Sequence, residues 1–184
     1  MIISISGTPG SGKTTVADIL AKDLGYASYY MGGLRRQLAK EKGMTIDELN
    51  KLGEQEAFTD KDIDEYQRKL GKEQDNFIIQ GRTSFYFIPH SFKVFLDVDA
   101  DEGARRVYQQ FKAGEWSVRN EDEPQSLAAA KQHLAARCAS DTKRYLKYYG
   151  FDCYAKKHYD LVIDTTKKTP AAIVAEIKAN LPKQ

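Results

Sequence analysis

The chain has 184 residues, of which 41% are hydrophobic and 29% charged, and its formal net charge is +2. This size and balance indicate one folded domain with its own core and exclude a disordered chain. No run approaches the roughly 20 apolar residues that cross a bilayer, and the near-neutral charge gives no case for a nucleic-acid polymer as partner. The two cysteines, Cys138 and Cys153, have no metal-type spacing. We expect reduced thiols in a cytoplasmic protein, with no membrane segment.

Short continuous apolar runs predict buried strands, in chain order at residues 2–6, 76–80, 93–98 and 159–164, with a weaker fifth at 26–30. Continuous rather than alternating apolar runs are typical of parallel strands that helices cover on both faces. Helical patterns lie between the runs, at 13–24, 33–42, 60–73, 102–112 and 124–149, the last as one helix or a broken one. Thr45 with Glu48 is a capping box, and Thr169 with Pro170 marks the start of a last helix.

This alternation predicts an α/β fold, a doubly wound parallel sheet of about five strands flanked by helices. Ligands of such sheets bind at the carboxyl ends of the strands. We therefore expect the functional residues to follow the strands directly.

The first strand runs into a phosphate-binding motif, GxxxxGK[ST], which spans Gly7-Thr8-Pro9-Gly10-Ser11-Gly12-Lys13-Thr14. Glycines let backbone N–H groups turn toward phosphate oxygens, and the following helix adds partial positive charge. Lys13 is expected to bridge the β- and γ-phosphates of ATP and the Thr14 hydroxyl to bind Mg²⁺, with Thr15 next to them. The alternative, a glycine-rich turn with a chance lysine, fits the strand-to-helix context poorly.

The motif alone does not fix the reaction. A GTPase should carry a base-reading NKxD motif late in the chain, and none is present. A motor ATPase should end a strand in paired acids, whereas here the third strand ends in Gln80-Gly81-Arg82. A kinase whose acceptor is an anion needs a second anion-binding pocket, lined by arginines.

Arginines are present on several predicted helices, after the third strand and in a polar stretch: Arg35, Arg36, Arg82, Arg105, Arg106, Arg119, Arg137 and Arg144. Arg137, Asp141 and Arg144 are spaced i, i+4, i+7 and share one helix face. Arg35 and Arg36 cannot both face one ligand, because consecutive helical residues point about 100° apart. For any single arginine, an ordinary surface salt bridge remains the alternative.

The sequence resembles the archaeal type of cytidylate kinase among the P-loop nucleoside monophosphate kinases. The resemblance is carried over nearly the whole length by the stretches 5–15, 36–44, 63–64, 80–82, 137–145, 148–152 and 159–165. The most discriminating stretch is Arg137-Cys138-Ala139-Ser140-Asp141-Thr142-Lys143-Arg144-Tyr145.

The resemblance implies a Mg²⁺-dependent transfer of phosphate from ATP to CMP or dCMP in a single kinase domain, residues 1–184, acting as a monomer. It implies an acceptor-binding insert at 31–70 and a lid at about 110–122. Acceptor binding would fall to Arg36, Asp64, Gly81, Arg82, Arg137, Asp141 and Arg144. The transferring phosphate would be reached by Lys13, Arg106, Arg119 and Arg137.

Three positions depart from the family pattern: Gln80 and Gly33 stand where acids are usual, and Gly103 stands where an arginine is common. These departures leave open another nucleotide or a coenzyme precursor as the acceptor. Gln80 also leaves open an ATP-binding regulatory module without catalysis.

Other acidic and aromatic residues have simpler expectations. Asp60 and Asp62 are expected as solvated residues at a helix start, while Asp64 divides evenly between that role and acceptor binding. Asp97 and Asp99 follow a strand and favour helix capping over metal contact. The tyrosines at 145, 148 and 149 are expected in the core.

Overall fold

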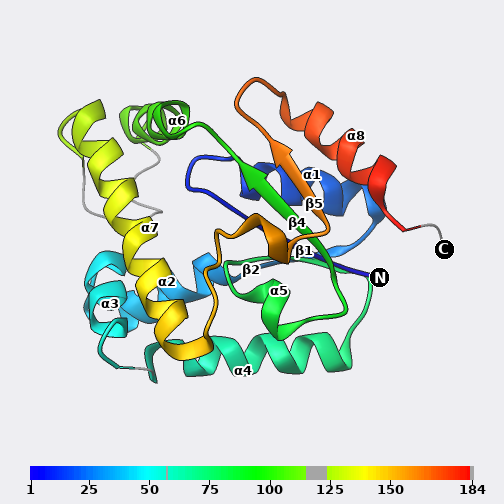
Figure 1. Cartoon of the computed structure of the whole chain (residues 1–184), viewed down its shortest axis with the longest axis horizontal. Helices are drawn as coiled ribbons and strands as arrows, with labels where there is room; N and C mark the ends of the chain where they lie inside the picture. The colour runs from blue at the N-terminus through cyan, green and yellow to red at the C-terminus, as the bar shows by residue number, and fades with distance from the viewer. Residues whose placement is uncertain (57, 115–123, 183–184) are drawn as a thin grey trace.

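The computed structural model describes residues 1–56, 58–114 and 124–182 (Figure 1). Its five strands form one parallel sheet in the order β2-β3-β1-β4-β5. The strands are β1 (Ile2–Gly7), β2 (Ala27–Tyr30), β3 (Phe77–Gln80), β4 (Phe92–Asp97) and β5 (Leu161–Asp164). The predicted α/β fold and all five predicted strands are confirmed.

The helices are α1 (Lys13–Leu24), α2 (Met31–Glu41), α3 (Ile46–Gly53), α4 (Phe58–Glu73), α5 (Ser84–Phe87), α6 (Ala100–Lys112), α7 (Leu127–Tyr149) and α8 (Pro170–Asn180), with a 3₁₀ turn η2 (Lys156–His158). The capping box of Thr45 and Glu48 forms as predicted, and Thr169 caps α8. The long helix α7 is unbroken. The patterns of α5 and η2 are too short to show in the sequence.

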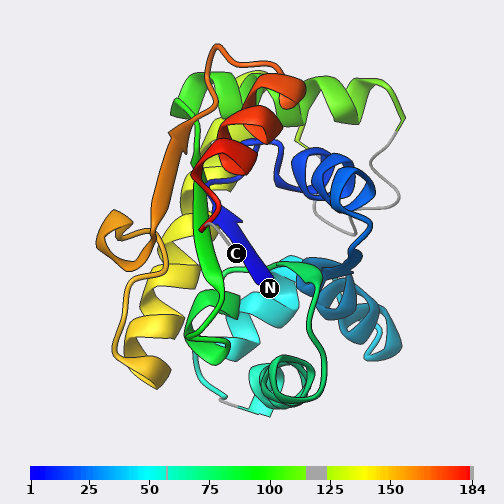
Figure 2. The same ribbon diagram turned by 90° about the vertical axis from the view of Figure 1, so that its right-hand side faces the viewer.

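Both faces of the sheet are covered, which explains the continuous apolar runs. Val16 and Leu20 of α1 pack with Ile173 and Ile177 of α8 on one face. On the other face, Leu70 of α4 joins Phe77 and Ile79 of β3 as one cluster, and residues of α5 and α7 form another. Figure 2 shows the sheet between α1 and α8 on one side and α7 on the other. No helix in the described ranges is long and apolar enough to cross a bilayer.

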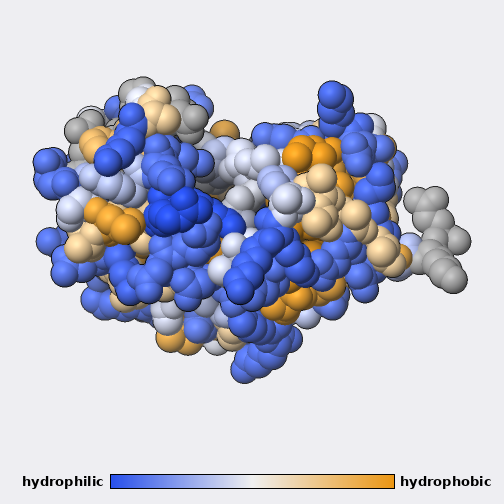
Figure 3. Space-filling model, turned by 90° about the horizontal axis from the view of Figure 1, so that it is seen from above, coloured by the Kyte–Doolittle hydropathy of each residue, from blue (hydrophilic) through white to orange (hydrophobic). Residues whose placement is uncertain are grey.

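The sheet order puts β1 between β3 and β4, so the loop after β1 lies between chain segments that follow its two neighbours. Segment 31–70 folds as α2, α3 and most of α4, and α3 packs against α7. Viewed from above, the molecule is hollowed between two halves (Figure 3). The carboxyl ends of the strands therefore open into a cleft between the loop after β1 and the helices of 31–70.

Candidate active site

The loop after β1 has the backbone of a phosphate cradle. Gly7, Gly10 and Gly12 have φ angles of 150°, 79° and 83°, which residues with a side chain rarely adopt. The Lys13 amine curls into the loop and donates to the carbonyl oxygens of Gly7 at 2.9 Å and Thr8 at 2.7 Å. These two hydrogen bonds hold the ammonium inside the loop, from where it can turn to a bound phosphate.

The first turn of α6 packs directly on this loop. A Cβ on Gly103 would lie 2.8 Å from the carbonyl oxygen of Pro9, and one on Gly10 would lie 2.4 Å from the carbonyl oxygen of Gly103. Arg106, one turn later, donates to the carbonyls of Thr165 at 2.9 Å and Thr166 at 3.0 Å. The loop, α6 and the segment after β5 are therefore fastened together on the donor side of the cleft.

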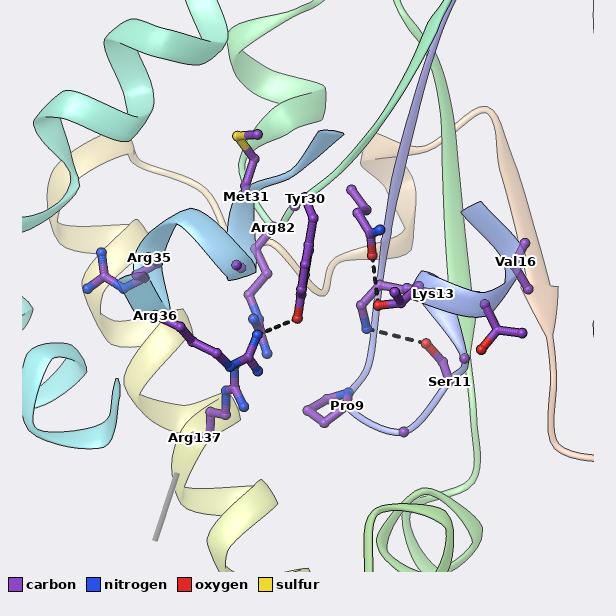
Figure 4. A pocket seen from close by; sticks show the side chains of 18 of the residues that line it. Pro9, Ser11, Lys13, Val16, Tyr30, Met31, Arg35, Arg36, Arg82 and Arg137 are labelled. Atoms are coloured by element: carbon purple, nitrogen blue, oxygen red, sulfur yellow. Dashed lines mark hydrogen bonds between the residues drawn. The ribbon is translucent and has the colours of Figure 1, made fainter. Parts of the chain in front are cut away.

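The opposite side of the cleft is cationic. A cavity of about 1380 Å³ is lined by Lys13 and Gln80 together with Arg36, Arg82 and Arg137. Figure 4 shows the guanidinium groups of these three arginines gathered across the cleft from Lys13. They come from α2, the segment after β3, and α7. Cationic side chains from three parts of the chain therefore converge on one position that suits an anion.

Arg82 is fixed by two partners behind it. Its Nε lies 2.6 Å from Asp141 Oδ2 and donates to the Tyr154 hydroxyl at 2.8 Å. Burial raises the pKa of Asp141, but the charges of Arg82 and Arg144 outweigh burial and hold this pKa below its usual range. Burial lowers the pKa of Arg82, and Asp141 more than offsets it, so this pKa is raised. The pair is charged at any physiological pH.

A second buried pair continues this network. Arg144, with 1% of its surface exposed, donates to Asp141 Oδ1 and to Asn50 Oδ1, both at 3.0 Å. Its Nε lies 3.2 Å from Asp60, which also pairs with Arg35. Asp60 is therefore not the solvated residue expected from the sequence, because two arginines draw it inside; Asp62 is exposed as expected.

Asp141 and Arg144 are absent from the described lining of the cleft. The structure brings them to the back of Arg82 rather than to the acceptor side, so direct acceptor contact by either stays a prediction. Arg35 and Arg36 have different partners, since Arg35 turns to Asp60 and Arg36 contacts Tyr30, although both arginines contribute to the lining of the cleft.

Asp64, a residue of α4, does line the cleft. It is buried and accepts a hydrogen bond from the Tyr149 hydroxyl. Burial raises its pKa to about 7, against the lowering effect of the Tyr149 bond, and the nearby charge of Asp60 adds to the rise. A carboxyl that titrates near neutrality inside a cleft is typical of a functional site.

The comparisons with known proteins agree with this geometry. Residues 2–167 match the model of the cytidylate kinase-like family. The chain belongs to that family. It is 33% identical to a cytidylate kinase of Methanobrevibacter smithii over 98% of both chains, and 36% identical to one of Thermococcus kodakarensis over 97% of this chain and 86% of the relative.

Solved structures share the fold at low sequence identity. An uncharacterised protein of Eubacterium ventriosum aligns with a TM-score of 0.66 at 21% identity, covering 100% of this chain and 99% of the other. The shikimate kinase of Bacteroides thetaiotaomicron aligns with a TM-score of 0.61 at 14% identity, covering 98% of both chains. These likenesses support the P-loop kinase fold alone.

Within the family site, Gln80 stands beside the residue predicted to hold the metal. Thr14 Oγ1 donates to Gln80 Oε1 at 3.0 Å, and the Gln80 side chain is buried. Mg²⁺ in nucleotide sites takes few protein oxygens and keeps waters and substrate phosphates as its other ligands. A threonine hydroxyl backed by an amide oxygen fits that need.

The other predicted positions have mixed outcomes. Asp99 caps α6 as expected, whereas Asp97 contacts the Thr8 hydroxyl and pairs with Lys156. Tyr145 is buried in the core, as expected, whereas Tyr148 and Tyr149 are half-buried. Arg119 and most of the predicted lid at 110–122, namely residues 115–122, lie outside the described residues.

Sequence reasoning missed three residues of the site: Tyr30, Asn50 and Tyr154. Asn50 is 94 residues from Arg144 and Tyr154 is 72 residues from Arg82, so spacing could not reveal these contacts. Tyr30 had a usable signal, because it ends a strand at the ligand edge of the sheet.

Proposed function

We propose that the protein transfers the γ-phosphoryl group of ATP to a nucleoside monophosphate, with CMP or dCMP as the preferred acceptor. The observation that carries this proposal is the arginine cluster facing the phosphate loop across one cleft. ATP needs only the loop, whereas a second set of cations fits a second phosphate. Family membership and the curated cytidylate kinases support the nucleotide acceptor.

In this proposal each wall has one task. The loop N–H groups and Lys13 hold and neutralise the β- and γ-phosphates, while Arg36 and Arg82 hold the acceptor phosphate in line. Phosphoryl transfer needs mainly such positioning and charge stabilisation. Arg137 and Arg106 would stabilise charge on the transferring group. Thr14 would hold Mg²⁺, with Gln80 orienting its hydroxyl; when bound, the ion would neutralise charge on the phosphates.

The finer predictions belong to the same proposal. Segment 31–70 would be the acceptor-binding insert, and 110–122 with Arg119 would close over the site and exclude water, so that ATP is not hydrolysed. Asp64 would contact the acceptor nucleoside. Cytoplasmic location, a monomeric state and dependence on Mg²⁺ are predicted with it.

The test is ADP production by the purified protein with ATP and Mg²⁺ against CMP, dCMP, UMP, AMP and GMP. We expect CMP or dCMP to give the highest kcat/KM. Lys13→Ala should lower turnover by about 100-fold or more, as expected for loss of a positioned charge. Lys22→Ala, an exposed lysine of the same helix, is the control. If no monophosphate raises ADP production above background, the proposal fails.

A further inference from the structure

Tyr30 is placed at the centre of the cleft by the sheet. It is the last residue of β2 and pairs with Gln80 of β3, so the two side chains leave the same edge side by side. Its neighbour Tyr29 is half-buried and packs against Phe77 of the core, with ring centroids 5.3 Å apart. Successive strand residues point to opposite faces, so Tyr30 turns to the cleft. Figure 4 shows its ring between the arginine cluster and Lys13.

Two glycines make room for this ring. A Cβ on Gly32 would lie 2.7 Å from Tyr30 Cε2, and a Cβ on Gly33 would lie 2.9 Å from Tyr30 Cδ1. Both glycines are in the first turn of α2, and neither has the left-handed φ that would itself demand glycine. Glycine is less favourable than alanine in a helix. The pair is therefore explained by the tyrosine ring that lies on it.

The hydroxyl of Tyr30 is held by Arg36. Arg36 Nη1 donates to the phenolic oxygen, and the guanidinium carbon lies 5.6 Å from the ring centroid. A guanidinium has donors only, so the phenolic hydrogen of Tyr30 is not used by Arg36 and is available to another acceptor. Tyr30 is 40% exposed and lines the cleft. It presents that donor beside Arg36, Arg82 and Arg137, where an anion is expected.

We propose that Tyr30 is an acceptor-binding residue whose hydroxyl accepts from Arg36 and donates to the acceptor's phosphate, and that Gly32 and Gly33 are kept small to seat its ring. This inference rests on the proposed kinase function. It adds a neutral donor to a set of arginines and fixes Arg36 before the acceptor arrives. A preorganised donor costs less to order on binding.

Tyr30→Phe removes the hydroxyl and keeps the ring. A hydrogen bond to a charged group predicts a rise of about 10-fold or more in the KM for CMP. The KM for ATP should stay within about 2-fold, because the donor phosphates bind the loop. Tyr29→Phe, whose hydroxyl bonds Gln74 away from the cleft, is the matched control and should change neither constant.

A mutant cycle tests the seat of the ring. Gly33→Ala alone should raise the KM for CMP because the methyl displaces the ring. In a Tyr30→Ala background the same change should leave this KM unaltered and raise the melting temperature, as alanine favours the helix. Additive effects in the cycle would overturn the coupling between ring and glycine.

The outcomes separate the two proposals. If the wild-type protein neither binds CMP in calorimetry nor phosphorylates any monophosphate, the proposed function fails. If the wild type uses CMP and Tyr30→Phe has the same KM, or raises both KM values alike, the kinase stands and the role of Tyr30 is refuted.

Discussion

Replacing Asp141 by Asn tests whether the buried network holds the acceptor side of the cleft. Asp141 is 2% exposed and lies 2.6 Å from Arg82 and 3.0 Å from Arg144. With Asp60 and Arg35, three guanidinium groups face two carboxylates, a net charge of +1. Asn keeps the shape and removes one carboxylate, so the same buried volume carries +2.

Removing one partner of a buried ion pair costs about 3–5 kcal/mol, because the other charge stays buried. For a chain of this length the melting temperature should fall by roughly 6–20 °C. Urea unfolding of wild type and variant at pH 7 measures the difference. Asp23→Asn is the control, since Asp23 pairs with Lys178 at 3.1 Å at a half-exposed position and should cost about 0–1 kcal/mol.

The pH dependence sharpens this test. The folded pKa of Asp141 is lowered, so its stabilisation is complete above the unfolded pKa of about 3.9 and is lost as pH falls through the folded value. The difference between wild type and Asn variant should be constant from pH 5 to 8 and shrink below about pH 4. A loss under about 1 kcal/mol, or a difference independent of pH, would refute the account of the network.

Three further changes probe the cleft itself. Gln80→Glu puts a carboxylate at a buried position beside Thr14, so the variant should melt lower without ligand and recover with Mg²⁺ and ATP; equal melting in both states would contradict a metal-side position. The pKa of Asp64 is raised to about 7, so the contribution of this carboxyl to the free energy of unfolding falls as pH rises from about 4 to 7. Asp64→Asn should flatten this dependence of the unfolding free energy on pH, measured by urea unfolding. An unchanged dependence would contradict the raised pKa. Gly103→Ala should raise the KM for ATP several-fold, because its methyl meets the Pro9 carbonyl at 2.8 Å, whereas Gly114→Ala, with open space around it, should leave this KM unchanged despite its φ of +81°.

The parts of the site that could be predicted from the sequence are those formed by residues close together in the chain. The phosphate loop is one continuous motif after a buried strand, so both its position and its backbone could be expected. Arg137, Asp141 and Arg144 share a helix face because of their spacing. The sequence could not show that this face turns inward, because the partners that make burial of Arg144 possible, the Asp60 carboxylate and the Asn50 amide oxygen, come from other helices.

The same reason explains the error at Asp60. An acid at a helix start is usually solvated, and nothing nearby in the chain indicates burial. In the fold, Arg35 and Arg144 meet there from α2 and α7. Burial of charge depends on partners, and here the partners lie 25 residues before Asp60 and 84 residues after it, so the fold rather than the local pattern brings them together.

Each of the three departures from the family pattern has one close contact in the structure. Gly33 lies under the Tyr30 ring, Gly103 lies against the phosphate loop, and Gln80 lies beside Thr14. Tyr30, whose ring lies on Gly33, is also the register partner of Gln80. Two of the departures, Gly33 and Gln80, are therefore next to Tyr30 at the edge of the sheet. Loss of function would leave such positions free to vary without matched contacts. Their fit to Tyr30, the loop and Thr14 favours a site rebuilt around the same transfer over an inactive ATP-binding module.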